Sequence, residues 1–178
     1  MRGVDRFRTL PEAEIRILVL VNEFSGTSLR PRELDGRVKL AKLDFLLRYP
    51  RYLARVLTGR GASNDEIESI NIDQSPFQQR MIRYRYGPWD PSYFATLGSL
   101  IGRGLVAAVP VQRGIGYRST PLGRQVVESV LSDDSWTHVH RNSQLIKRHL
   151  DLAGTTLKKL LYEQIPEMTD ADWHEELE

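Results

Sequence analysis

The chain has 178 residues, a length typical of one domain with extensions or of two very small domains. It contains no cysteine, which excludes a disulfide scaffold, a thiol nucleophile and a cysteine metal site. Hydrophobic residues make up 40% of the chain, enough for a real core, but the charged start lacks a signal-peptide core and the apolar run at 17–21 is far shorter than a membrane span. We therefore expect a cytoplasmic protein that does not contact a membrane.

The net charge of +2 is unevenly distributed. The last sixteen residues, Glu163 to Glu178, hold seven acids and neither Lys nor Arg, so the first 162 residues carry a net charge of +9. A basic body with an acidic tail suggests a polyanionic partner, a basic protein partner for the tail, or both. That the tail is only a solvated, frayed end remains an open alternative.

The N-terminal half is predicted to be helical. The first helix spans 11–25, with Pro11 as its first helical residue; it is apolar on most sides, which places it in the centre of the fold, and Gly26 ends it. A second helix is expected at 32–48 and a short one at 51–57, followed by a loop or insertion at 58–79. The second helix should bury Leu34, Val38, Ala41 and Phe45 and leave Arg37, Lys39, Lys42 and Arg48 in solvent.

The middle of the chain predicts an extended segment and a third main helix. Residues 80–86 are predicted to form a strand, and the Gly-Pro-Trp-Asp-Pro sequence at 87–91 is typical of a turn. Asp90 is expected as the N-cap of a helix that runs to about Gly104. Its inward residues should be Tyr93, Leu97, Leu100 and Ile101, and the aromatic cluster of Trp89, Tyr93 and Phe94 is expected to be core.

A two-stranded ribbon follows, with a strand at 105–112, a glycine turn at 113–116 and a returning strand at 117–119. Pro110 predicts that the ribbon lies at a sheet edge. Thr120 and Pro121 begin another helix, which 132–135 interrupts, and further helices are expected at about 136–152 and 155–164.

Three helices followed by a ribbon with a glycine turn is the element order of a winged helix. We therefore predict a mostly α fold of the α+β class, with a winged-helix core at 1–131 and a C-terminal helical extension with an acidic tail at 132–178. The segment 50–88 would be an insertion between the second and third helices of that core.

The third helix lacks the side chains that read DNA bases. In a DNA-reading winged helix this element carries Arg, Lys, Asn or Gln toward the major groove. Here the outward positions are expected to be Ser92, Ala95, Thr96, Ser99 and Arg103. Gly98 and Gly102 lie one turn apart, and because glycine destabilises a helix, this spacing favours close approach of another backbone. The candidate protein interface comprises Gly98, Ser99, Gly102, Arg103 and, in the acidic tail, Trp173.

Arginines gather at other positions. Arg80, Arg83 and Arg85 alternate with apolar and tyrosine residues in the expected strand, and Arg113 and Arg118 lie in the ribbon. Interleaved Arg and Tyr can hold phosphates without reading sequence, so these five are candidate contacts to DNA phosphates. Pairing of the same arginines with acids of this chain or of a partner is an equally open interpretation.

Catalytic motifs are missing from the sequence. It has no Gly-x-Ser-x-Gly elbow, no Walker loop and no dinucleotide-binding glycine loop. His138 and His140 are two residues apart and would point to different faces of a helix, which argues against a metal site. We expect no enzyme, no catalytic or metal-binding residues and no cofactor; a nuclease using Asp and His is the competing hypothesis.

The chain resembles the middle component of bacterial ABC-three-component systems, the group that includes the Lamassu defence systems. The resemblance covers roughly residues 15–130, and the C-terminal 45 residues have no counterpart in it. It depends on the order and spacing of four segments: Lys39-Leu40-x-Lys42-Leu43-x-Phe45-Leu46, Tyr86-Gly87-Pro88-Trp89, Leu100 to Leu105, and Thr120-Pro121-Leu122-Gly123.

The resemblance implies partners that composition could not reveal. Such a middle component links the head or neck region of an SMC-like ATPase to an effector, often a nuclease, and has no catalytic residues of its own. The function expected is therefore that of a non-catalytic accessory subunit of an antiviral or anti-plasmid defence complex, with DNA at most held nonspecifically. The alternative is a stand-alone winged-helix DNA-binding regulator or antitoxin-like protein.

Overall fold

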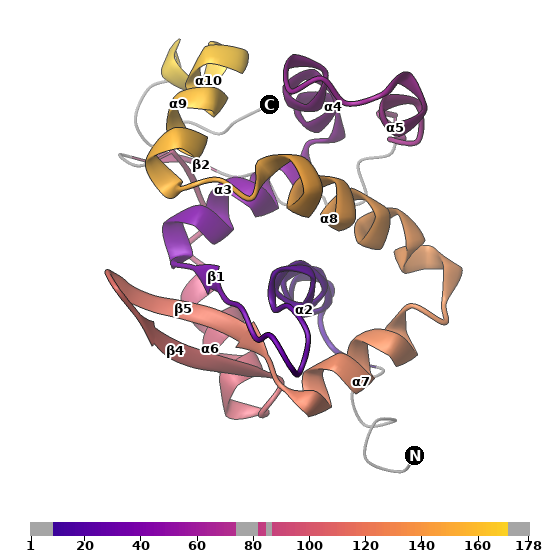
Figure 1. Ribbon diagram of the computed structural model, residues 1–178, viewed down its shortest axis with the longest axis vertical. Coiled ribbons are helices and arrows are strands. Elements are labelled where there is room, and N and C mark those ends of the chain that lie inside the picture. The colour runs from indigo at the N-terminus through magenta and orange to yellow at the C-terminus, as the bar shows by residue number, and fades with distance from the viewer. Residues whose placement is uncertain (1–8, 74–81, 85–86, 171–178) are drawn as a thin grey trace. The chain divides into compact units, whose positions relative to one another are not determined.

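The computed structural model describes residues 9–73, 82–84 and 87–170 (Figure 1). Helices account for most of them, and three short strands form one antiparallel sheet. The predicted α+β class with a mostly helical chain is therefore confirmed.

Contacts divide the chain into two compact units. The first comprises Met1–Arg37 and Pro91–Gln144, and the second comprises Val38–Asp90 and Leu145–Glu178. Each unit therefore combines segments that are far apart in the sequence. These contacts do not separate the chain at residue 131, and the predicted division into a core and an extension stays a prediction.

The first unit is built around helix α2 (Glu12–Phe24). The other elements of this unit, in chain order, are β1 (Leu34–Asp35), α6 (Tyr93–Gly102), β4 (Val106–Val111), β5 (Gly114–Ser119), α7 (Pro121–Val130), the 3-10 turn η1 (Asp134–Trp136) and the start of α8 (Thr137–Leu150) (Figure 1). Helix α2 packs against α6, α7 and β5, and all its residues from Glu14 to Val21 are buried. The predicted central helix is confirmed, although Pro11 occupies the N-cap position rather than the first helical one.

The C-terminal end of α2 is attached to the sheet. The Ser25 hydroxyl donates to the Val21 carbonyl (2.6 Å) and accepts from the Ser119 backbone N–H (2.8 Å). Gly26 follows with φ of 66°, a left-handed conformation that favours glycine and ends the helix as predicted. One hydroxyl therefore fixes the helix end against β5.

The three-stranded sheet has the order β1-β5-β4. Strands β4 and β5 form the predicted ribbon, and Pro110 lies on β4, an edge strand as predicted. Strand β1 corrects the expectation of a helix over 32–48, because buried Leu34 pairs with Tyr117 and Gly36 (φ 87°) separates the strand from the helix. Tertiary pairing with β5 overrides the helical pattern of these few residues.

Helix α7 begins at the predicted Thr120 cap. The Thr120 hydroxyl accepts from the Gly123 backbone N–H (3.0 Å) and donates to the Gly104 carbonyl (2.6 Å). A Cβ at Gly123 would lie 2.1 Å from the Leu105 carbonyl oxygen, so only glycine fits this contact. The cap therefore also holds α7 against the connection between α6 and β4.

The second unit is a set of packed helices with a two-stranded hairpin. Its elements are most of α3 (Arg37–Arg48), α4 (Pro50–Gly59), α5 (Asn64–Glu68), β2 (Ile82–Tyr84), β3 (Gly87–Trp89), the end of α8, α9 (Gly154–Gln164) and α10 (Glu167–Asp170). Helix α4 packs against α5 and α9. The buried apolar residues of the second unit include Leu43, Phe45, Leu46, Leu53, Leu57, Leu157 and Leu161.

Several polar residues of α3 lie where the sequence did not predict them. Lys39, Lys42 and Arg48 are buried rather than solvated, and Val38 is 42% exposed. Arg48 donates to the Asp90 carboxylate at 2.8 Å. Asp90 therefore forms an ion pair with Arg48. It is not the N-cap of the third helix, which begins at Tyr93. Helix α3 is enclosed on nearly all sides, so its polar residues cannot all reach water.

The segment 58–79, predicted as a loop, contains helix α5. Ser63 and Glu66 form a reciprocal capping box, in which each side chain accepts from the other residue's backbone N–H (3.2 and 2.9 Å). The two C-terminal helices expected at about 136–152 and 155–164 are confirmed as α8 and α9.

Within the described ranges, no helix is both long and apolar enough to cross a lipid bilayer.

Candidate functional site

Helix α6 separates its residues clearly into a buried and an exposed side. Tyr93, Thr96, Leu97 and Leu100 face the first unit's core, where α6 packs on α2 and β4. The exposed side contains Phe94, Ala95, Gly98, Ile101 and Gly102, of which Phe94 is 59% and Ile101 37% exposed. We call these five residues the α6 face. It carries no charge and no side-chain hydrogen-bond donor.

Three sequence predictions for α6 need correction. Phe94, expected in the core with Tyr93, lies in solvent, and Ile101, expected to face inward, is partly exposed. Thr96, expected to face outward, is only 8% exposed. The helix begins at Tyr93 rather than after Asp90. Its packing on α2 and β4 buries Thr96 and leaves Ile101 partly exposed.

Gly98 and Gly102 both lie on the α6 face. A Cβ at either position would meet nothing within 4 Å. Within the described part of this chain, therefore, no backbone makes the close approach that the sequence predicted at these glycines. They leave the helix surface open between Phe94 and Ile101.

Ser99 and Arg103 border this face and interact with each other. The Arg103 Nε donates to the Ser99 hydroxyl at 3.1 Å and lies 3.7 Å from the Glu14 carboxylate of α2. The side chain of Arg103 remains 46% exposed. The one strong base-reading side chain predicted for this helix is thus directed along it by local contacts.

At the other end of the face, Arg37 lies over the Phe94 ring. Its guanidinium carbon is 4.4 Å from the ring centroid, a cation–π geometry. Sequence reasoning missed Phe94 as a functional candidate. Its spacing of four residues from Gly98 was the available signal, since i and i+4 share a helix face.

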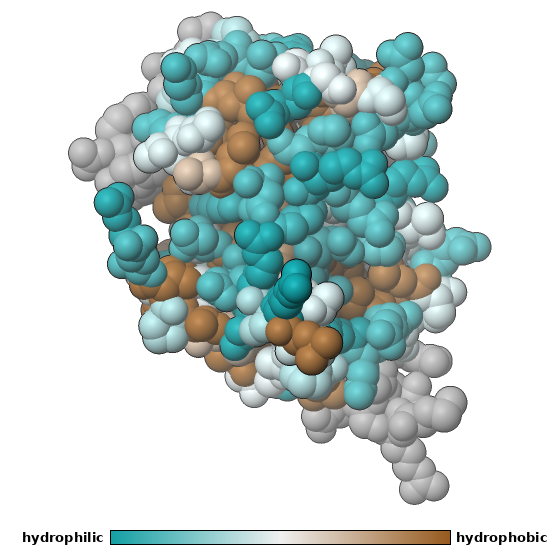
Figure 2. Space-filling view, in the orientation of Figure 1, coloured by the Kyte–Doolittle hydropathy of each residue, from teal (hydrophilic) through white to brown (hydrophobic). Residues whose placement is uncertain are grey.

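The β4–β5 ribbon carries two arginines and no acid between Val106 and Ser119. Arg113 is exposed in the turn, just before Gly114 (φ 119°), and Arg118 lies opposite Ala107. Across the described residues, neither arginine has a carboxylate within ion-pair distance. Figure 2 shows hydrophobic surface over the exposed end of this ribbon, where Ile115 is 53% exposed.

The remaining predicted phosphate contacts cannot be placed as a group. Arg80, Arg85 and the predicted interface residue Trp173 lie outside the described residues. Arg83 belongs to β2, which pairs with β3 and so confirms part of the predicted strand at 80–86. Arg113 and Arg118 lie on one hairpin, Arg113 in its turn and Arg118 toward its open end, opposite Ala107.

Comparisons with known proteins identify no relative of this chain. No protein-family model, curated protein or solved structure matches the chain.

His138 and His140, both on α8, lie in different environments. His140 Nε2 lies 2.9 Å from the Glu23 carboxylate, whereas burial, as the main cause, lowers the pKa of His138. Among the described residues, no group of three or more His, Cys, Asp or Glu side chains could hold a metal ion.

Proposed function

We propose that this chain is a non-catalytic accessory subunit that holds other proteins, with the α6 face as its protein-contact surface. The observation that carries this proposal is an exposed phenylalanine and isoleucine on either side of an open glycine, on a helix without a base-reading side chain on its exposed face. Exposed aromatic and aliphatic side chains with room for a close partner are typical of protein interfaces.

The scaffold of this surface is, in our proposal, a winged helix. Support comes from the chain order α2, β1, α3, then α6, β4 and β5 after the intervening α4, α5, β2 and β3, and from the pairing of β1 with β5 beside β4. In that scheme α6 is the helix that normally enters the major groove, and the β4–β5 hairpin is the wing. A helix with a neutral, apolar exposed face suits a protein groove better than the polar edges of bases.

The partners we propose follow from the sequence resemblance. They are an SMC-like ATPase and an effector such as a nuclease, and the subunit would bridge the head or neck region of the ATPase to the effector in a defence complex. The bordering Arg37 and Arg103 favour a partner with acidic residues next to an apolar ridge.

The test is co-expression with the proteins encoded beside this chain, followed by purification and affinity measurement. Phe94→Ser should weaken the complex roughly tenfold or more, because it removes the largest apolar group of the α6 face. Ile115→Ser is the matched control, since Ile115 is similarly exposed but lies on the hairpin. A chain that purifies alone, or equal effects of the two substitutions, would contradict the proposal.

A second candidate function is that of a stand-alone winged-helix DNA-binding regulator, and the ribbon favours it. Its two arginines lack carboxylate partners in the described structure, as expected for phosphate contacts. Arg113→Ala should then reduce the slope of log affinity against log salt by about 1. A regulator also requires preference for one sequence; equal binding to all duplexes would leave only a nonspecific contact.

A further inference from the structure

A small surface cavity lies at the end of helix α7, where the chain enters the 3-10 turn η1. Its volume is about 230 Å³, which is room for the end of a long side chain or for a short alkyl compound. The cavity is lined by Ile15, Ser129, Val130, Ser132, Asp133 and Trp136. All six residues belong to the first unit, and none of them belongs to the α6 face.

Apolar and aromatic side chains form one part of the lining. Ile15 is 6% exposed in the central helix α2, and Val130 is half-buried at the end of α7. Trp136, in η1, is also half-buried, and no described ring or cation lies against its indole. The cavity therefore presents an apolar surface and an aromatic ring to a bound group.

The charged part of the lining is one carboxylate, and no described lysine or arginine lines the cavity. Asp133 is the N-cap of η1, and its carboxylate accepts from the Ser135 backbone N–H at 2.9 Å. This bond, as the main cause, lowers the pKa of Asp133, so the carboxylate is ionised at neutral pH. A carboxylate has about four acceptor positions, and no described cation pairs with this one.

Two further features favour a positively charged group. The Ser132 hydroxyl donates to the Ser129 carbonyl at 2.6 Å, so its oxygen is left as an acceptor. Glu12, exposed on α2, lies one helical turn before Ile15 and therefore on the same side of that helix. Its carboxylate adds a second negative charge on this side of α2.

We propose that this cavity binds a primary ammonium group carried on a short alkyl chain, with Asp133 as the charged acceptor and Trp136 as the aromatic contact. An ammonium group carries only N–H donors, which match a carboxylate and a hydroxyl oxygen. Indole is the aromatic side chain that attracts a cation most strongly. Ile15 and Val130 would contact the methylene groups. A lysine side chain of another protein and a free alkylamine share this chemistry.

The test is a titration of the isotopically labelled chain with n-butylammonium chloride at constant ionic strength, followed by amide and indole chemical shifts. Shifts should change first at Asp133, Ser135 and Trp136. Asp133→Asn should weaken the affinity roughly tenfold or more, because it removes the charge of the acceptor, while asparagine can still cap η1. Trp136→Leu should weaken the affinity roughly threefold, through loss of the cation–π contact.

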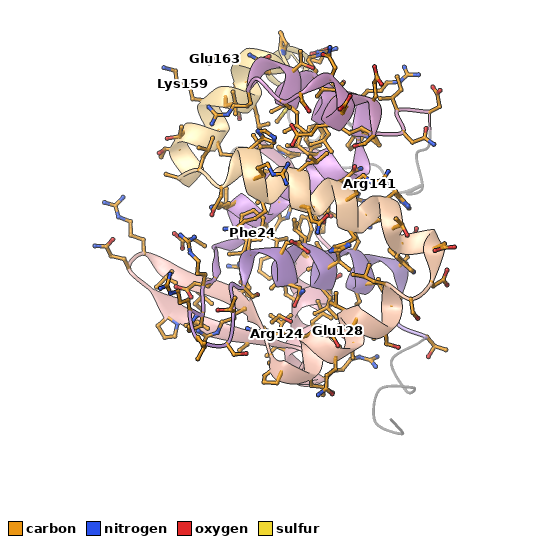
Figure 3. All side chains as sticks on the ribbon, turned by 45° about the vertical axis from the view of Figure 1, so that its right-hand side comes forward. Phe24, Arg124, Glu128, Arg141, Lys159 and Glu163 are labelled. Carbon is orange, nitrogen blue, oxygen red and sulfur yellow. The ribbon has the colours of Figure 1, made fainter. Side chains whose placement is uncertain are left out.

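Two controls remove a carboxylate outside the lining. Asp134→Asn is the matched variant, because Asp134 is the next residue of the chain, is exposed and does not line the cavity. Glu128→Gln removes an exposed carboxylate of α7, the helix at whose end the cavity lies (Figure 3). Both variants should bind n-butylammonium as the wild type does. The uncharged alcohol 1-butanol should bind much more weakly.

Nα-acetyl-lysine methylamide distinguishes the two sources of the ammonium group. Binding at least as tight as that of n-butylammonium would identify a lysine of another protein as the ligand, and weaker binding would identify a free alkylamine. The proposal is overturned if n-butylammonium shifts no residue of the cavity, if Asp133→Asn and Asp134→Asn behave alike, or if 1-butanol binds as well as n-butylammonium.

Discussion

The buried lysines of α3 show how a single residue can depart from its sequence pattern. Lys39 and Lys42 occupy positions that an amphipathic helix would leave in water, yet both are buried. Lys39 reaches a carboxylate 112 residues away in the chain, whereas Lys42 finds only a backbone carbonyl. Their environments depend on α8 and α9, which no local pattern in α3 encodes.

The lowered pKa of Lys42 predicts a pH-dependent stability. In the unfolded chain this amine keeps a pKa near 10.5, against about 8 when folded, so unfolding takes up a proton between these values. The cost of the buried charge is complete below pH 8 and disappears as pH rises toward 10.5. Lys42→Met should therefore increase the free energy of unfolding at pH 7, by on the order of 1–3 kcal/mol.

Urea unfolding at pH 7, 8, 9 and 10 in phosphate-free buffer measures this difference. The advantage of Lys42→Met should shrink with rising pH, and exposed Lys159→Met should show no such trend. An advantage that stays constant to pH 10 would mean that Lys42 is not desolvated.

Adding a methyl group at two different glycines should change the stability of the chain in opposite directions. Gly123→Ala should destabilise the chain by about 1–3 kcal/mol, because its Cβ would overlap the Leu105 carbonyl oxygen. Gly98→Ala should instead stabilise it by roughly 0.5–1 kcal/mol, since Gly98 is helical and its Cβ meets open space. Chemical denaturation of both variants compares them directly, and equal signs would contradict the packing described here.

At the scale of elements, α5 is held to α8 by one carboxylate. Glu66 accepts from the Ser63 backbone N–H and also from Arg148 and His149 of α8. These contacts, with the Ser63 N–H as the largest cause, lower the pKa of Glu66 to about 2. The stabilising effect of the carboxylate is complete above pH 4.5 and is lost as pH falls toward 2.

Glu66→Gln should accordingly lower stability at pH 7, and the difference from wild type should close between pH 4.5 and pH 2. Unfolding by urea across this range provides the measurement. Glu68→Gln, an exposed change in the same helix, serves as the control. A deficit of Glu66→Gln that is independent of pH would show that charge is not what joins α5 to α8.

Helix α6 could be predicted from the sequence only in part. Its existence, its approximate end and its lack of base-reading residues could be predicted from sequence. Which residues face outward could not, because the packing of α6 on α2 and β4 decides that Thr96 is buried and Phe94 lies in solvent. The exposed aromatic group at the centre of the proposed interface therefore came from the tertiary structure.

At the scale of the whole molecule, the second unit depends on two separate chain segments. Helix α9 contributes buried Leu157 and Leu161 and packs against α4, which begins 104 residues earlier in the chain. A chain ending at Asp151 should expose the apolar side of α4, which includes Leu53 and Leu57. We expect that truncation to unfold α4 and α5 while α2, β4 and β5 keep their structure.

Hydrogen exchange resolved by residue tests this expectation. Amides of α4 should lose protection in the truncated chain, and those of α2 and β5 should keep it. Full protection of α4 would show that 38–90 folds without the C-terminal helices. Loss of protection throughout would show that the two units unfold as one.

By itself, the sequence determined the class of the fold and most of its elements. Hydrophobic periodicity, a threonine cap and the proline in β4 are local signals, and they located α2, the hairpin and α7–α9 correctly. Only the tertiary structure decided that 34–35 form a strand, that Asp90 pairs with Arg48, and that Lys42 is buried. These features depend on segments distant in the chain, and the energy of a contact between them is not encoded in either segment alone.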